Sequence, residues 1–172
     1  GFSKKINEYC ASIFSKIYDF EIIGLRFFTV FGEWGRPDML IFKYLKANFT
    51  NNKFYLNENG KHYRDFTYID DAINILIKIK NKKFNKKFCI FNICSNRPIK
   101  IINVIKKINE INHNFKYIPK SSKLLKKIEV NTTHGNNSKI LKYLKNFNFT
   151  DFDKALFKTI KWYIDENIYK IT

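Results

Sequence analysis

Three positively charged side chains stand at places where a protein can bind an anion. Lys4 lies at the start of a helix, Arg36 lies in a loop rich in glycine and proline, and Arg64 begins a short strand directly before Asp65. A planar guanidinium binds phosphate or carboxylate with two parallel hydrogen bonds. Because the chain has only four arginines, Arg36 and Arg64 are candidate ligands for an anionic molecule.

Arg64 also has a structural interpretation. Its guanidinium can instead pair with Asp65, Asp70 or Asp71 and hold neighbouring segments together. The residues alone favour neither interpretation, and both stay open at this point.

The net charge of +17 raises the question of a polyanionic partner. Clustered basic residues bind phosphates, but here the lysines are scattered along the chain and interleaved with Asn and Ile. We attribute them to a general bias in composition and expect no specific nucleic-acid partner. A basic remnant that binds nucleotides or nucleic acid without catalysis is the alternative.

Composition and motifs restrict the class of protein further. With 172 residues, of which 45% are hydrophobic, the chain can bury a core of one domain or one and a half. Three cysteines without CxxC spacing support neither disulfides nor a zinc site, and the three histidines are too far apart in sequence to indicate a metal cluster. Without an apolar run of membrane length or a signal segment, we expect a cytoplasmic protein with no membrane contact.

Hydrophobic periodicity predicts alternating helices and strands, which is typical of α/β proteins. The apolar run 21–30 predicts a strand covered on both faces, and Pro37 is expected at the beginning of the helix that follows the next loop. Helices are predicted at 3–18, 38–49, 71–80, 98–111, 137–146 and 151–166, and strands at 21–30, 54–56, 64–68, 88–93 and 115–118.

Four segments carry a resemblance to a known family. They are LRFFTVFGEWGRPDM (25–39), RDFTYIDD (64–71), FNIC (91–94) and EVNTTHGNNSK (129–139). Together they resemble the C-terminal half of the extended short-chain dehydrogenase/reductases, the NAD-dependent epimerase/dehydratase family. The GRPDM run is most similar to the UDP-glucuronate 4-epimerases. Cys94 departs from the pattern, since it stands where the family usually has glycine.

The resemblance implies a fold and a division of the chain. Residues 1–30 and 69–95 are expected to be the C-terminal part of an NAD-binding Rossmann domain. Residues 31–68 and 96–172 are expected to form a small α/β domain that binds the nucleotide-sugar. We therefore expect helix 3–18 to lie beside the strands at 21–28 and 88–93, and we expect the intact enzyme to be a homodimer.

The resemblance also implies roles for individual residues. Lys4 matches the lysine of a catalytic Tyr-x-x-x-Lys pair and would bind the ribose of NAD, with the tyrosine falling immediately before Gly1. Phe28 would lie beside the nicotinamide. The residues implied in binding a UDP-sugar are Thr29 and Arg36 for the sugar and its anionic groups, Phe54, Tyr55 and Leu56 for the uracil, and Arg64 with Lys126 for the diphosphate.

The expected function is therefore that of the C-terminal portion of an NAD-dependent nucleotide-sugar 4-epimerase. It would interconvert UDP-glucuronate and UDP-galacturonate through a 4-keto intermediate, and the fragment alone is expected to be inactive. A dehydratase or decarboxylase of the same family is the alternative enzyme.

Overall fold

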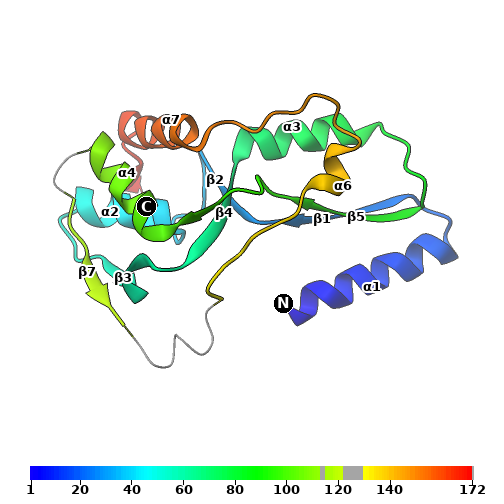
Figure 1. The fold of residues 1–172 in the computed structure, drawn as a ribbon, viewed down its shortest axis with the longest axis horizontal. Helices are drawn as coiled ribbons and strands as arrows, with labels where there is room; N and C mark the ends of the chain where they lie inside the picture. The colour runs from blue at the N-terminus through cyan, green and yellow to red at the C-terminus, as the bar shows by residue number, and fades with distance from the viewer. Residues whose placement is uncertain (113–114, 122–129, 172) are drawn as a thin grey trace.

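The computed structural model describes residues 1–112, 115–121 and 130–171 (Figure 1). Its helices and strands alternate along the chain, as the periodicity predicts. In order they are α1 (Phe2–Ile17), β1 (Ile22–Phe27), β2 (Thr29–Phe31), α2 (Leu40–Phe49), β3 (Tyr55–Asn57), the short 3-10 helix η1 (Glu58–Gly60), β4 (Tyr63–Tyr68), α3 (Ile69–Lys80), β5 (Phe88–Ile93), β6 (Pro98–Lys100), α4 (Ile101–Ile111), β7 (Ile118–Lys120), α6 (Ser138–Leu141), α7 (Phe152–Asp165) and α8 (Ile168–Ile171).

Strands β1 and β5 form a parallel pair from Ile22 opposite Phe88 to Phe27 opposite Ile93. Figure 1 shows α1 on one side of this pair and α3 on the other. Parallel strands covered by helices need apolar side chains on both faces, which explains the nearly unbroken apolar runs of β1 and β5. The expectation that helix 3–18 lies beside these two strands is confirmed.

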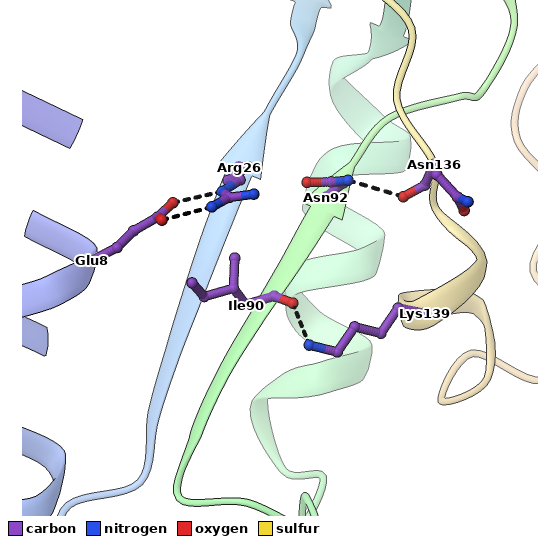
Figure 2. A network of polar contacts seen from close by, with 6 residues as sticks. All are labelled: Glu8, Arg26, Ile90, Asn92, Asn136 and Lys139. Atoms are coloured by element: carbon purple, nitrogen blue, oxygen red, sulfur yellow. Dashed lines mark hydrogen bonds and ion pairs between the residues drawn. The ribbon is translucent and has the colours of Figure 1, made fainter. Parts of the chain in front are cut away.

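Polar contacts fix the elements on either side of the β1–β5 pair (Figure 2). From α1, the Glu8 carboxylate accepts two hydrogen bonds from the Arg26 guanidinium on β1, at 2.6 and 2.7 Å. On the other side of the pair, the Asn92 side chain donates to the Asn136 carbonyl at 3.0 Å. From α6, Lys139 Nζ donates to the Ile90 carbonyl at 2.8 Å. Segments distant in sequence are thus held on one parallel strand pair.

The remaining strands build two further small sheets. In the first, β4 lies between β2, which is parallel to it, and β6, which is antiparallel. In the second, β3 pairs with β7 in parallel. Helices α2, α4, α7 and α8 pack around these strands, and their buried side chains form one hydrophobic cluster with Phe31, Leu56 and Phe66.

The single strand predicted at 21–30 is wrong, because the chain breaks at Phe28. Up to Phe27 the backbone pairs with β5, and the Phe28 N–H still donates to the Ile93 carbonyl at 3.3 Å. From Thr29 onward the chain pairs with β4 instead, opposite Phe66. The expected cover on both faces is also wrong for β1, because none of its side chains is buried and Phe27 is 49% exposed. An apolar run by itself does not indicate where a strand changes its pairing partner.

The predicted start of the second helix is also wrong. Pro37 lies in a turn that the Met39 N–H closes on the Arg36 carbonyl at 3.1 Å, and α2 begins only at Leu40. Proline suits the second position of such a turn because its φ is already set. Three short elements, η1, β6 and α8, were not predicted, and α6 ends at Leu141 instead of continuing to 146. The predicted helix 98–111 begins only at Ile101, and the strand predicted at 115–118 lies at Ile118–Lys120.

A second hydrophobic cluster lies between α3, β5 and α6. It contains Ile75 and Ile79 from α3, Phe91 from β5, and Ile140 with the nearby Leu144. Residues 140–144 therefore pack with the β1–β5 part of the chain. The boundaries of the two expected domains stay a prediction. None of the helices in the described ranges is long and apolar enough to cross a membrane.

Candidate functional site

A cavity of about 350 Å³ opens between β2, the loop after it, α2, β3 and β4. Its wall is formed by residues from each of these five segments, together with Ile101 of α4 and Thr159 of α7. Six of the residues predicted to bind substrate line it: Thr29, Arg36, Phe54, Tyr55, Leu56 and Arg64. A cavity of this size suits a small organic ligand.

Arg64 enters this wall by strand geometry. Side chains alternate along a strand, and His62, Arg64 and Phe66 all line the cavity. The guanidinium Nη1 also donates to the Tyr63 carbonyl at 2.8 Å and to the Asn131 carbonyl at 3.4 Å. These bonds to backbone carbonyls hold a half-buried cation at the cavity wall.

The next residue, Asp65, faces the opposite side of β4 and is fully buried. Its Oδ1 accepts hydrogen bonds from the Ser95 N–H at 3.1 Å and from the Ser95 hydroxyl at 2.8 Å. Its Oδ2 accepts from the Gly135 N–H at 3.0 Å. Asp71 similarly accepts from the Thr150 N–H and hydroxyl at 2.9 and 2.8 Å. Both carboxylates therefore connect segments far apart in sequence.

Arg36 reaches the cavity from the loop between β2 and α2. Its Nε and Nη2 donate to the two carboxylate oxygens of Asp38, at 3.0 and 2.6 Å. The Arg36 guanidinium lowers the pKa of the Asp38 carboxyl. Asp38 also lines the cavity, as does Thr29 at the start of β2. The loop therefore places one cation and one anion at the cavity.

The two residues expected to contact NAD lie at one end of the parallel pair. Phe28 directly follows β1, at its carboxyl end. Lys4 is exposed and lies one helical turn before Glu8, which bonds to Arg26 near that same end. Ligands of parallel α/β sheets bind at the carboxyl ends of the strands, so both positions fit such a site. Lys126 lies outside the described residues.

Tight packing surrounds the Phe28 ring. A side chain on Gly135 would stand 2.3 Å from the Cys94 sulfur and 2.8 Å from the Phe28 ring. Glycine is therefore required where this segment crosses the end of β5. Burial raises the pKa of the Cys94 thiol to about 11, so the thiol beside Phe28 stays protonated and neutral at neutral pH.

A second group with a raised pKa is Tyr68, the last residue of β4. The Tyr68 hydroxyl donates to the Glu33 carboxylate at 2.9 Å. Burial, together with Glu33, raises the pKa of Tyr68 well above its usual range. This phenol therefore stays protonated and acts as a structural hydrogen-bond donor. In the described residues no group of His, Cys, Asp and Glu side chains is arranged to hold a metal ion.

Among the residues that line the cavity and that the sequence prediction missed are His62 and Asp38. The histidines were considered only as metal ligands, although His62 stands two residues before Arg64 and so lies on the same face of an extended segment. Its ring is buried, with 7% of the residue exposed. Asp38 stands two residues after Arg36, a spacing that a turn converts into an ion pair.

Comparisons with known proteins identify the family and the fold of this chain. Residues 1–94, more than half of the chain, match the model of the NAD dependent epimerase/dehydratase family. UDP-glucuronate 4-epimerase 5 of Arabidopsis thaliana is 32% identical over 94% of this chain and 40% of its own length. Protein CapI of Staphylococcus aureus is 29% identical over 95% of this chain and 53% of its own length. The chain thus spans about half or less of the length of these relatives.

A solved structure supports the fold. UDP-glucuronic acid 4-epimerase from Bacillus cereus, in complex with UDP-glucuronic acid and NAD, superposes with a TM-score of 0.81 at 24% identity. The superposition covers 92% of this chain and 50% of that protein. The mixed α/β architecture with parallel strands is therefore the Rossmann-like one that the sequence predicted. The family match, which extends from α1 to the end of β5, shows that this chain belongs to the NAD dependent epimerase/dehydratase family.

Proposed function

We propose that this chain is the C-terminal portion of an NAD-dependent nucleotide-sugar 4-epimerase that interconverts UDP-glucuronate and UDP-galacturonate through a 4-keto intermediate. The observation that carries the proposal is the cavity that gathers Thr29, Arg36 and Arg64 with the segment 54–56.

The charges of the cavity match those of the proposed ligand. Arg64 stands on a strand and is held by backbone carbonyls, which suits a diphosphate whose position must be fixed. Arg36 stands on a loop and suits the more variable sugar end, together with the Thr29 hydroxyl. The backbone of residues 54–56 would bind the edge of the uracil, since its N–H and C=O groups can form hydrogen bonds with a base.

The described residues also fit the cofactor of the family. Phe28 offers an aromatic face, and Lys4 offers an ammonium that can hydrogen-bond ribose hydroxyls; both lie at the carboxyl end of β1. When bound, NAD supplies the acceptor for the hydride that leaves the sugar. Lys4 would also lower the pKa of a neighbouring phenol, because a nearby positive charge favours the phenolate.

We also propose that the intact enzyme is a cytoplasmic homodimer. Helix α1 supports the homodimer, because it exposes a continuous stripe of large apolar side chains on the face turned away from β1. The stripe consists of Phe2, Ile6, Tyr9, Ile13 and Ile17. Apolar surface of this extent on one helix is typical of a face that binds another protein.

The proposed function is tested by calorimetric titration of the 172-residue chain with UDP, UDP-glucuronate and a random-sequence RNA. We expect saturable binding of both nucleotides and much weaker binding of the RNA. Replacing Arg64 by Ala is expected to weaken UDP binding by about tenfold or more, because hydrogen bonds to charged groups contribute roughly 1.5–3 kcal/mol.

Arg97→Ala is the matched control, because it removes the same charge from an exposed residue outside this cavity. It should leave UDP affinity unchanged. Equal affinity for UDP-glucuronate and RNA, with a linear fall of log affinity against log salt concentration, would instead support a basic polyanion-binding protein.

A further inference from the structure

The ion pair between Arg36 and Asp38 occupies the hydrogen-bond donors that an acidic ligand would use. Nε and Nη2 of Arg36 form one edge of the guanidinium, and each donates to a different oxygen of the same carboxylate. A carboxylate on a bound sugar would bind this edge in the same geometry. Both residues line the cavity. Asp38 therefore stands where it competes directly with such a ligand.

The pair is positioned by local backbone geometry. The Met39 N–H donates to the Arg36 carbonyl and closes a turn around Pro37, which brings side chains two residues apart together. Both partners of the pair belong to the loop 32–39 between β2 and α2. Opening the pair thus needs only side-chain rotation and leaves α2 in place.

The pair is also weak enough to be displaced. The side chains of Arg36 and Asp38 are 75% and 53% exposed, so water screens their attraction. Lys43, at the start of α2, adds to the effect of Arg36 in lowering the pKa of the Asp38 carboxyl. If Arg36 turns to a ligand, Asp38 keeps Lys43 as a counter-charge and stays ionised at neutral pH.

We propose that Asp38 is a specificity-determining residue, because it restricts hydrogen bonding by Arg36 to sugars that carry a carboxylate. A ligand whose sugar has a carboxylate displaces Asp38 and gains the two hydrogen bonds. A ligand with a neutral sugar leaves the pair closed and gains nothing from Arg36. This inference rests on the proposed function, because it takes UDP-sugars as the ligands of the cavity.

The test compares UDP-glucuronate with UDP-glucose by calorimetric titration of the wild-type chain and of Asp38→Asn. Asparagine keeps the shape of the side chain but removes the charge that competes for Arg36. We expect the affinity for UDP-glucuronate to rise about two- to fivefold, the range that an exposed ion pair allows. The affinity for UDP-glucose should stay within experimental error.

A double-mutant cycle isolates the role of Arg36. In the Arg36→Ala background, Asp38→Asn should no longer change the affinity for UDP-glucuronate, because the donors that Asp38 blocks are gone. Glu110→Gln removes one negative charge from an exposed position on α4, outside the cavity. It should change neither affinity, which controls for net charge.

Three outcomes would overturn the inference in distinguishable ways. If Asp38→Asn strengthens both ligands equally, the residue acts only through its general negative field. If it changes neither ligand while UDP still binds, Asp38 is a surface residue without a role in selection, and the proposed function stands. If the wild-type chain binds no UDP-sugar at all, the proposed function fails together with the inference.

Discussion

Asp65 shows how a single side chain can join three distant segments. Its two oxygens accept from Ser95 and Gly135, while Thr133 Oγ1 accepts from the Asp65 N–H at 3.3 Å. Burying a carboxylate is costly unless its oxygens are hydrogen-bonded, and here both are. The sequence suggested Asp65 as a partner of Arg64, but the described bonds of its carboxylate are to the segments at 95 and 135.

We expect Asp65→Asn to lower the free energy of unfolding by about 1–3 kcal/mol. The amide places an NH2 donor where a carboxylate oxygen accepts a hydrogen bond. Urea unfolding followed by circular dichroism measures the change. Glu110→Gln, at an exposed position, should stay within about 0.5 kcal/mol of the wild type. A similar small change for Asp65→Asn would show that the connection between the segments does not depend on the charge.

The candidate site could be predicted only in part at this scale. Arg36 and Arg64 were candidates from their chemistry, and the resemblance to a family added Thr29 and the segment 54–56. His62 and Asp38 were missed, because only the extended backbone at 62–66 and the turn at 36–39 place them in the wall. Sequence spacing indicates which faces residues share, but not which loop closes over a cavity.

Helix α1 depends on few contacts, and the Glu8–Arg26 pair is one of them. The Arg26 guanidinium lowers the pKa of the Glu8 carboxyl below its ordinary value of 4.5. A carboxyl whose pKa is lowered in the folded state stabilises the fold above its unfolded pKa, and the effect is lost as the pH falls through the folded value. The attachment of α1 should therefore weaken only in acid.

The attachment of α1 can be measured through the rotational mobility of a nitroxide label on Cys10, an exposed residue of this helix. We expect mobility to increase when the pH falls below about 4.5. In Glu8→Gln, mobility should be raised at every pH and show no such transition. Asp153→Asn, which removes the Lys107–Asp153 pair from α4 and α7, should keep the transition. If the acid-induced increase in mobility persists in Glu8→Gln, it arises from the protonation of another group.

Most helices and strands of six or more residues could be predicted from periodicity, whereas short elements such as η1, β6 and α8 could not. The parallel partners β1 and β5 were both predicted because their apolar runs are long. In contrast, β6 has three residues, Pro98–Lys100, too few to show an alternation. The break between β1 and β2 also escaped prediction, because it depends on pairing with β4 and not on a glycine or proline in the run.

The described residues form two hydrophobic clusters of different size. The cluster around α2, α4 and α7 includes the fully buried Tyr44, Ile105 and Leu156. The cluster around α3 and β5 is smaller. On the opposite side of the β1–β5 pair, α1 leaves Tyr9 69% exposed and Ile17 67% exposed. Much of the apolar surface near β1 thus faces solvent in the described chain.

We therefore expect the 172-residue chain to associate with itself, because exposed apolar surface and unpaired strand edges favour contact between copies. Sedimentation velocity over a range of concentrations should show a mass that increases with concentration. The double variant Tyr9→Glu with Ile13→Glu should reduce this increase in mass. Phe157→Glu, which removes an exposed aromatic side chain from α7, should not. A monomer at every concentration would contradict the expectation.

The pairing of β1 with β5 also sets an order on folding during synthesis. Ile22 finds its partner only when Phe88 has left the ribosome, after β2, α2, β4 and α3 have been made. At about 5–20 residues per second, β1 waits on the order of several seconds with its apolar side chains uncovered by β5. We expect chaperones that bind extended apolar segments to bind the nascent chain during this interval, and slower translation before Phe88 to lengthen the interval.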